Sequence, residues 1–350
     1  KSRITIFFLF YNLATLFGHN TMKNQQTILI TGGAGYIGSA VAYHMAQLGY
    51  KIIIIDKLNY GQKFDHEWAS LVVSDFSDEQ VLEDILTKNK IDAVVHCAES
   101  IEVGLSVKNP KAFYENNVVK TLKFLNTLIK HNVKKVIFSS TCAVYGIPKY
   151  LPLTEEHSKD PISAYGNTKL TIEYILKDYQ IAYGLSYVAL RYFNAAGAIV
   201  DQNLGEIHKP ETHLIPLVIE AALQNKVFKI FGDDYKTQDG TNIRDYLHVK
   251  DIASAHEKAL NLLENGIESI QVNLGTGKGY SVKEVVEAVE FELKSKVNSQ
   301  YVIRRPGDPD ILVADPSKAK ELLGWNPKHS SLQEIVKDAC DFYKNNKLNS

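Results

Sequence analysis

Between residues 27 and 190, short runs of β-branched residues alternate with longer stretches of helical periodicity. The runs are apolar almost throughout, which is typical of parallel strands covered on both faces; half-exposed strands instead alternate apolar and polar residues. These runs occupy residues 27–31, 51–55, 71–73, 93–96, 136–139 and 187–190. Repeated strand–helix–strand units predict an α/β fold built on a doubly wound parallel sheet.

The pattern loosens in the second half of the chain. Loops rich in Gly, Asp and Pro interrupt it at 233–240 and 305–310. We predict a first domain over 22–195 and a smaller lobe of mixed α/β structure over 196–350 that covers a substrate. Two later stretches are again apolar enough to join the main sheet, 249–263 and 272–274. We therefore expect parts of 245–290 to return to the first domain.

Residues 1–21 differ from the rest, because an apolar run over 4–11 follows Lys1 and Arg3. A basic start before a short apolar run resembles a signal peptide, but no small-x-small cleavage pattern follows it. The run is also too short to span a membrane. Met22 stands shortly before the first predicted strand. We therefore expect residues 1–21 to be an upstream extension outside the fold and not an export signal.

Composition narrows the classes of function. The 350 residues carry 39 basic and 40 acidic side chains, a net charge of −1. This balance argues against a surface for nucleic acid or for an anionic membrane. Cys97, Cys142 and Cys340 form no C-x-x-C motif and no zinc-ligand spacing. An odd count without such a pattern is typical of a reducing compartment, so we expect a cytoplasmic protein without a disulfide framework or a bound metal.

A glycine-rich turn over residues 31–38 joins the first predicted strand to the first helix. Bare backbone at Gly33 and Gly35 allows a tight turn close to a pyrophosphate, and the helix N-terminus faces the negative charge. Asp56 ends the second strand, where an acidic side chain binds a ribose diol and repels a 2′-phosphate. In this context the turn predicts that residues 22–195 form a Rossmann domain that binds NAD in preference to NADP.

Tyr165 and Lys169 stand four residues apart at the start of a predicted helix, so they share one face. A free phenol has a pKa of about 10. A neighbouring ammonium and the positive nicotinamide ring of oxidised NAD would lower this pKa and make the phenolate a base for a sugar hydroxyl. Such a pair is common by chance, but Thr141 ends the preceding strand, at the edge where ligands of these sheets bind. Its hydroxyl can bridge the substrate and the phenol, whereas Ser139 and Ser140 are interpreted as strand-end residues.

The glycine turn, the Ser-Ser-Thr strand end and the Tyr-x-x-x-Lys pair resemble the extended short-chain dehydrogenase/reductase superfamily. Further stretches resemble its UDP-glucose 4-epimerases, namely residues 114–118, 144–146, 190–194, 235–249, 273–275 and 304–308. The resemblance extends from about residue 27 to near the C-terminus. It implies NAD-dependent inversion at C4 of a UDP-hexose through a transient 4-keto sugar, as in galactose metabolism. It also implies a homodimer joined by long helices over 113–131 and 163–183.

The resemblance also implies the site residues. Catalysis is assigned to Tyr165, Lys169 and Thr141. Cofactor binding is assigned to Gly32, Gly35, Tyr36, Ile37, Asp56, Asp75, Phe76, Cys97, Ala98, Asn117, Ser139, Tyr165, Lys169 and Tyr192. Substrate binding is assigned to Thr141, Tyr165, Asn194, His213, Leu214, Phe231, Arg244, Arg305, Asp308 and Leu312. Within these sets Phe231 is expected near the uracil, the two arginines on the phosphates, and Asp75 near the adenine, although a turn cap explains Asp75 nearly as well.

Some positions depart from the pattern of the family. Glu99 stands where a small residue is usual, and Ile101 where many epimerases carry a lysine near the cofactor. His213 replaces a common asparagine, and we interpret it as a phosphate or sugar contact and not as a metal ligand, because no second ligand is spaced to join it. Leu312 replaces a bulky tyrosine of some members. The smaller side chain predicts some activity on UDP-N-acetylglucosamine.

Other functions within the same fold stay open. Related 4,6-dehydratases carry an Asp-Glu pair directly after the strand-end threonine, whereas this chain has Cys142 and Ala143. A sister nucleotide-sugar reductase or decarboxylase is the main alternative to an epimerase. A non-catalytic NAD-binding regulator is a further one, but such proteins usually lose the tyrosine or the lysine.

Overall fold

The structure is a computed structural model that describes residues 26–59, 64–208, 210–267, 269–305 and 307–348. The apolar segment over residues 1–21 lies outside these ranges. Within them, no helix combines the length and the apolar character needed to cross a membrane.

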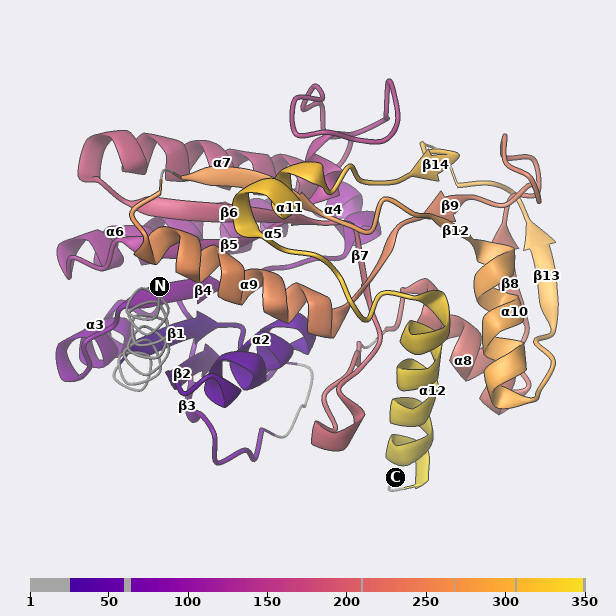
Figure 1. Ribbon diagram of the computed structural model, residues 1–350, viewed down its shortest axis with the longest axis horizontal. Coiled ribbons are helices and arrows are strands. Elements are labelled where there is room, and N and C mark those ends of the chain that lie inside the picture. Colours follow the sequence, from indigo (N-terminus) through magenta and orange to yellow (C-terminus); the bar gives the residue numbers. More distant parts are fainter. Residues whose placement is uncertain (1–25, 60–63, 209, 268, 306, 349–350) are drawn as a thin grey trace, which may run out of the picture.

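The described residues include seven parallel strands that form one central sheet, in the order β11-β6-β5-β4-β1-β2-β3 (Figure 1). The strands are β1 (Thr27–Thr31), β2 (Lys51–Asp56), β3 (Ser70–Val73), β4 (Ala93–His96), β5 (Lys135–Thr141), β6 (Ser186–Tyr192) and β11 (Ile270–Leu274). The chain runs outward from β1 to β3 and then returns to β4 on the other side of β1. This reversal confirms the doubly wound α/β fold.

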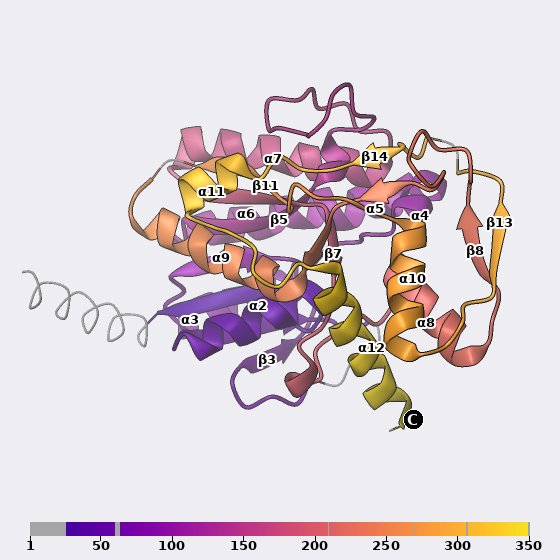
Figure 2. The ribbon, with the colours of Figure 1, turned by 45° about the vertical axis from the view of Figure 1, so that its right-hand side comes forward.

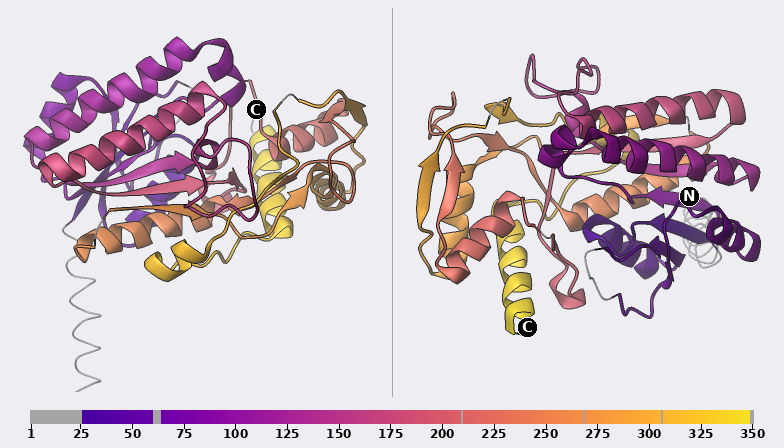
Figure 3. Two further views of the ribbon diagram at one scale, coloured as in Figure 1. Left: turned by 90° about the horizontal axis from the view of Figure 1, so that it is seen from above. Right: turned by 180° about the vertical axis from the view of Figure 1, so that it is seen from behind.

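Helices cover both faces of the sheet, as the view from above shows (Figure 3). One face carries α2 (Tyr36–Gln47), α9 (Val249–Glu264) and α11 (Ser317–Leu323); the other carries α3 (Glu79–Lys88), α6 (Lys120–Lys130) and α7 (Ala164–Tyr183). Neighbouring residues of one strand enter opposite layers: Ile30 packs with the first set of helices and Leu29 with the second. Both faces are therefore buried, which explains the nearly continuous apolar runs.

Part of the second half of the chain lies with this sheet. Helix α9 packs against α2, and β11 pairs with β6 as an edge strand of the sheet. This agrees with the apolar character of residues 249–263 and 272–274.

The expected helix over residues 113–131 has a different form. Helix α5 (Pro110–Phe113) leads into a π-helical segment, η1 (Tyr114–Val119), and only then into α6. The N–H of Lys120 bonds to the carbonyl of Glu115, five residues earlier. This wider turn accompanies the full burial of Asn117, and single π turns inside helices are frequent at functional sites.

The rest of the chain forms a smaller lobe of mixed structure beside the sheet (Figure 2). Its helices α8 (Leu214–Gln224), α10 (Val282–Leu293) and α12 (Leu332–Leu348) share one apolar core. Short strands pair at its margins: β7 (Asn194–Ala196) with β10 (Tyr246–His248), β8 (Phe228–Phe231) with β13 (Ser299–Val302), and β9 (Ile243–Arg244) with both β12 (Tyr280–Ser281) and β14 (Ile311–Leu312). Short helical turns and helix α4 complete the described elements: α4 (Val103–Lys108), η2 (Cys142–Val144) and η3 (Val200–Gln202).

Candidate active site

The glycine turn has the geometry of an anion cradle. Gly32 has a φ of +67°, and a Cβ there would lie 2.8 Å from the backbone of Ala98. Gly35 precedes α2 and has no side chain to cap it, so the first N–H groups of the helix are left for a ligand. The carboxylate of Asp56 accepts hydrogen bonds from the N–H of Ala34, 3.1 Å away, and from the N–H of Leu58, 2.8 Å away. An acidic side chain thus lies beside the cradle, as a dinucleotide requires.

The two residues that open α2 lie half-buried next to this turn. The hydroxyl of Tyr36 donates to the carbonyl of Gly197 at 2.8 Å, which ties the helix to the start of the lobe. Ile37 packs against the core on the α2 face of the sheet.

Asp75 caps a turn and pairs with lysines. Its carboxylate accepts from the N–H and the hydroxyl of Ser77, and it contacts the ammonium groups of Lys57 at 2.8 Å and Lys120 at 2.6 Å. Burial by itself raises the pKa of this carboxyl, but the bonds from these donors outweigh it and hold the pKa well below its usual range. Phe76 is buried against the rings of His96 and Phe124. The turn cap is therefore present, and the adenine contact stays a prediction.

The start of α7 brings the Tyr–Lys pair to the carboxyl end of β5. The hydroxyl of Ser163 caps this helix by accepting from the N–H of Gly166 at 3.1 Å. One turn later Lys169 donates to the carbonyl of Ser139 at 2.6 Å, and its Nζ lies 5.7 Å from the centre of the Tyr165 ring. The catalytic trio predicted from the sequence, including Thr141, is thus brought together at one strand end.

Glu99 joins this cluster, and its pairing was not foreseen from the sequence. Its carboxylate forms an ion pair with the ammonium of Lys169, and both side chains are almost fully buried. Burial lowers the pKa of Lys169 to about 7, while Cys97 and Glu173 act in the opposite direction. The carboxylate of Glu99 in direct contact adds a further stabilisation of the charged ammonium.

The phenol of Tyr165 does not have the lowered pKa that the sequence argument expected. Burial raises the pKa of Tyr165, and only a hydrogen bond with the Thr141 hydroxyl acts to lower it. The expected effect of the ammonium is not seen, for a physical reason: Lys169 is neutralised by Glu99, and its Nζ lies 5.7 Å from the centre of the Tyr165 ring. The effect expected from the nicotinamide ring stays a prediction.

A chain of hydrogen bonds runs beneath the cluster. The Ser139 hydroxyl accepts from the Tyr192 hydroxyl at 3.0 Å and contacts the Cys97 sulfur, also at 3.0 Å. The Tyr192 hydroxyl also contacts the Nε2 atom of His256 at 2.8 Å. Burial raises the pKa of the Cys97 thiol to about 11, so this group is not a thiolate nucleophile at neutral pH.

Asn117 braces the loop that carries Glu99. Its amide accepts from the N–H of Ser100 at 2.9 Å and donates both to the carbonyl of Ser100 and to the hydroxyl of Thr168 on α7. The N–H of Ala98 approaches the Thr31 hydroxyl at 3.3 Å. The loop after β4 is therefore fixed to both β1 and α7. These hydrogen bonds occupy the side-chain amide of Asn117, so this residue contributes to the site by holding the loop after β4 in place.

The residues expected to bind substrate lie on the lobe and its junction with the sheet. The guanidinium of Arg244 forms an ion pair with Asp308, and that of Arg305 stacks 4.0 Å from the centre of the Phe231 ring. The side chain of Asn194 donates to the carbonyl of Asp245 at 2.9 Å. Leu312 stands opposite Arg244 in the β14–β9 pair and packs beside a core cluster that contains Cys142 and Leu170. Leu214 begins α8, directly after His213.

The expectation that no second metal ligand accompanies His213 is wrong. His208, Glu206 and Glu211 all lie near its imidazole, so other groups that can bind a metal are present around it. These residues precede His213 by two to seven positions, and the path of an irregular loop brings their side chains together.

A buried network next to the site was also missed. Arg191 on β6 donates to both carboxylate oxygens of Glu173 and to the Tyr145 hydroxyl, and the Ser140 hydroxyl donates to Glu173. An arginine inside an otherwise apolar strand was the available signal, because a buried charge requires a partner.

A model of the NAD dependent epimerase/dehydratase family matches residues 28–275 of the chain. The UDP-glucose 4-epimerase of Rhizobium meliloti is 46% identical over 323 residues, which are 92% of this chain and 98% of that protein. Among solved structures, UDP-glucose 4-epimerase from Brucella ovis in complex with NAD is 43% identical, with a TM-score of 0.86 over 90% of this chain and 97% of that one. The UDP-Glc/GlcNAc 4-epimerase of Campylobacter jejuni is 40% identical, with a TM-score of 0.80 over 91% and 99% of the two chains.

Proposed function

The chain belongs to the NAD dependent epimerase/dehydratase family, and on this premise we propose that it interconverts UDP-glucose and UDP-galactose by inversion at C4. The observation that carries this proposal is the meeting of Tyr165, Thr141 and Lys169 at the end of β5, beside the glycine turn. A base, a hydroxyl relay and a dinucleotide cradle at one sheet edge are the components that a transient oxidation at a sugar carbon needs.

The chain's residues carry the proton in this reaction. Tyr165, as the phenolate, accepts the proton of the sugar 4-hydroxyl, and the Thr141 hydroxyl relays it between sugar and phenol. NAD, when bound, supplies the acceptor and donor of the hydride at C4. The proton then returns from Tyr165 to the oxygen of the 4-keto sugar, which presents its other face. A released keto sugar would be lost product, so the site must retain the sugar and exclude water in between.

The residues present fit a dinucleotide. The N–H groups at the start of α2 would bind the pyrophosphate, Asp56 would bind the adenosine ribose, and Lys169 and Tyr165 would act at the nicotinamide. We assign NAD binding to the Rossmann half of the chain. The first N–H groups of α2 support this assignment, because they require an anionic partner or water.

The lobe provides the groups for the nucleotide part of the substrate. The Phe231 ring offers a flat surface for the uracil, and the guanidinium groups of Arg244 and of Arg305, which stacks on this ring, offer positive charge for the diphosphate. The guanidinium of Arg244 forms an ion pair with the carboxylate of Asp308. Binding of the diphosphate therefore exchanges one anionic partner of this guanidinium for another.

The proposal is tested with purified protein and UDP-galactose, in an assay that couples the UDP-glucose formed to a dehydrogenase. Tyr165→Phe keeps the ring but removes the base, so the turnover number falls by about 10²–10⁴-fold. Tyr174→Phe is the matched control, because this tyrosine lies on the same helix and is 56% exposed. Full activity of Tyr165→Phe, or no conversion of UDP-galactose by the wild type, contradicts the proposal.

We also propose that the site accepts N-acetylated sugars. The half-buried Leu312 is smaller than the tyrosine found in some family members, and the Campylobacter jejuni relative is named as acting on both kinds of sugar. Leu312→Tyr fills the space and lowers kcat/KM for UDP-N-acetylglucosamine more than for UDP-galactose. Equal effects on both substrates contradict this assignment.

We propose that the chain forms a homodimer through its outer helices. Helices α6 and α7 lie side by side on one outer face (Figure 3), next to α4 and η1. These elements carry large apolar side chains that are 38–77% exposed, namely Val103, Leu105, Val107, Tyr114, Val119, Leu122, Tyr174, Ile181 and Tyr183. An exposed apolar patch over packed helices is typical of a homodimer interface. Ile181→Asp places a charge in it and shifts the mass measured by light scattering toward the monomer; a monomeric wild type contradicts the proposal.

We place the protein in the cytoplasm. Cys97, Cys142 and Cys340, all within the described residues, are free thiols, and free thiols persist in reducing compartments.

A further inference from the structure

Four side chains that can bind a metal gather in the loop between β7 and α8. Glu206, His208, Glu211 and His213 follow one another in the sequence with the spacing E-x-H-x-x-E-x-H. One ligand atom from each side chain can be chosen so that all of these atoms lie within 4.8 Å of one another. None of these residues takes part in the proton transfer proposed above.

The distances between these groups suit a single ion. The Nδ1 atom of His213 lies 2.8 Å from Oε1 of Glu206 and 3.2 Å from Oε1 of Glu211. The Nδ1 atom of His208 lies 3.4 Å from Oε1 of Glu206 and 3.9 Å from Oε2 of Glu211. Bonds of about 2.0–2.2 Å in a tetrahedral zinc site place the ligand atoms about 3.3–3.6 Å apart. The observed separations lie on both sides of this range, so small rotations of the side chains bring all four groups onto one ion.

Burial adds a second, independent observation. The side chains of Glu206 and Glu211 are only 7% and 5% exposed. The Oε2 atom of Glu211 is buried and accepts no hydrogen bond from any residue that the structure describes. This oxygen points toward the cluster, at the 3.9 Å separation from His208. A buried carboxylate oxygen without a donor is costly, and a cation between the four groups removes that cost.

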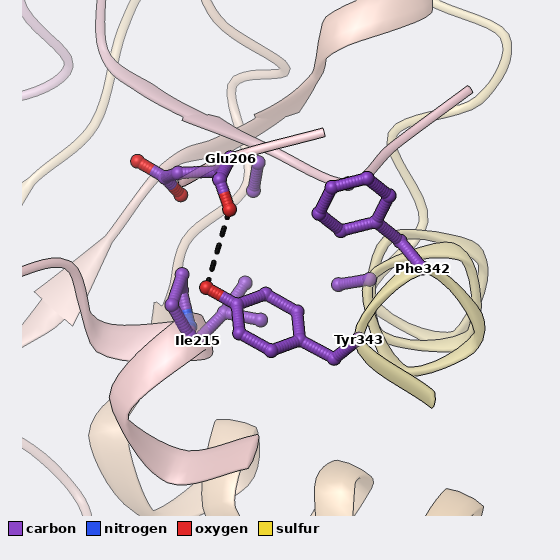
Figure 4. A pocket seen from close by; sticks show the side chains of 8 residues that line it. Glu206, Ile215, Phe342 and Tyr343 are labelled. Atoms are coloured by element: carbon purple, nitrogen blue, oxygen red, sulfur yellow. Dashed lines mark hydrogen bonds between the residues drawn. The ribbon is translucent and has the colours of Figure 1, made fainter. Parts of the chain in front are cut away.

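The backbone around the cluster is anchored on both sides. The hydroxyl of Tyr343 on α12 donates to the backbone carbonyl of Glu206 at 3.2 Å. Figure 4 shows this bond, and it shows the carboxylate of Glu206 directed away from the pocket that Phe342 and Ile215 line. At the other side the Oε1 atom of Glu211 accepts from the N–H of His213 at 2.9 Å, at the start of α8. Hydrogen bonds to the backbone therefore hold Glu206 and His213 at the two ends of the cluster.

We propose that Glu206, His208, Glu211 and His213 bind one divalent transition-metal ion of the zinc class. Two imidazoles favour such an ion over calcium or magnesium, which prefer oxygen ligands alone. Four protein ligands leave no open position for a substrate, so the site is structural. The ion fixes the loop before α8 and thereby positions Leu214, while His213 faces the metal and not the sugar.

Zinc binding by the full chain tests this proposal. After removal of metals with a chelator, the protein is titrated with zinc chloride in a calorimeter, and cobalt chloride is added to a second sample as a spectroscopic probe. We expect one ion per chain and cobalt absorption bands of a tetrahedral site. His208→Ala and Glu211→Gln each weaken zinc binding by at least about tenfold, because even changes around the ligands of metal sites cost about 10–100-fold.

Two controls keep the result interpretable. His329→Ala removes a histidine of the same lobe that pairs with Glu334 at 2.6 Å outside the cluster, and it leaves zinc binding unchanged. The thermal midpoint of the wild type rises with zinc, whereas that of Glu211→Gln, which retains the size of the side chain, does not. Equal zinc affinity in wild type and both cluster variants, or an octahedral cobalt spectrum, overturns the proposal. Circular dichroism of each variant shows whether it is folded, and a misfolded variant is replaced by His213→Gln.

Discussion

Helix α7 carries one partner of each of two buried ion pairs, and the two pairs differ in how their charges are satisfied. In the Glu173–Arg191 pair, both side chains are at most 4% exposed and each has further partners: the Ser140 hydroxyl donates to Glu173 at 2.6 Å, and Arg191 donates to the Tyr145 hydroxyl at 2.8 Å. The Glu99–Lys169 pair is equally buried. Neither oxygen of Glu99, however, accepts a further hydrogen bond within the described residues.

This difference in hydrogen bonding indicates that the Glu173–Arg191 pair is structural, whereas the Glu99–Lys169 pair can change partners. Two charges taken from water are stabilised only when the remaining lone pairs and protons find donors and acceptors. The first pair meets this condition and joins α7 to β5 and β6. The second does not, and it lies where the catalytic tyrosine and the cofactor are expected. An incompletely satisfied buried charge thus marks the reactive part of this molecule, as it does in many active sites.

Breaking the saturated pair has the largest effect on stability. Glu173→Gln removes a charge but retains the shape, and it leaves the Arg191 guanidinium buried without compensation. We expect the free energy of unfolding in urea to fall by about 3–5 kcal/mol. Glu115→Gln changes a carboxylate that is 62% exposed, and it alters this free energy by no more than about 0.5 kcal/mol. Similar losses in both variants would show that the network does not stabilise the fold.

A buried histidine on β4, the strand before Glu99, makes the stability of the fold depend on pH. The ring of His96 contacts the hydroxyls of Thr31 at 2.7 Å and Thr121 at 2.9 Å, and burial lowers its pKa to about 3. Below about pH 6.5 the unfolded chain binds a proton that the native ring does not, so stability falls as the pH falls. The contribution of His96 to this loss is about 2 kcal/mol between pH 7.5 and 5.

Urea unfolding at several pH values measures this dependence, with His96→Gln as the comparison. The variant keeps polar atoms in the strand but does not titrate, so its stability changes less steeply over the same range. Parallel curves for the two proteins would place the proton uptake elsewhere, for example at His256, whose pKa burial lowers to about 4.

Breaking the unsaturated pair has the smallest energetic effect, and it appears in catalysis. Burial lowers the pKa of Lys169 to about 7, so below this pH the side chain keeps its proton without Glu99. In Glu99→Ala its positive charge is then no longer neutralised and favours the phenolate of Tyr165. We expect the acid limb of the kcat profile against pH to move down by about one unit, which corresponds to about 1.4 kcal/mol. The rate on this acid limb rises accordingly. Glu115→Ala leaves the profile in place, and an acid limb that stays or moves up in Glu99→Ala contradicts the assigned role of this carboxylate.

The strands could be predicted because their apolar pattern lies within a short stretch of sequence. Runs such as residues 52–55 are apolar throughout because both faces of the parallel sheet are covered, and this pattern can be recognised without knowing which strands lie beside it. The π-helical segment over 114–119 was not predictable, because a single turn with a wider hydrogen bond leaves the apolar spacing of the helix almost unchanged.

The site was predictable where a motif fixes the local backbone. The glycine turn and the Tyr165–Lys169 pair need only a strand and a helix in sequence. The contact of Glu99 with Lys169 depends instead on the adjacency of β4 and β5 and on the reach of two side chains far apart in the sequence. The cluster around His213 depends on the path of an irregular loop, which no periodicity specifies.

The hydrogen bond between Tyr36 and Gly197 has a mechanical consequence. Gly197 has a φ of +82°, and a methyl group there would collide with the ring of His248, 2.5 Å from the added atom. At Gly197, where the chain passes from the sheet into the lobe, the backbone therefore has a conformation that only glycine adopts without strain. Tyr36, the first residue of α2, holds this backbone by its hydrogen bond to the carbonyl of Gly197. A tilt of the lobe away from the sheet at this point therefore breaks the bond between Tyr36 and Gly197.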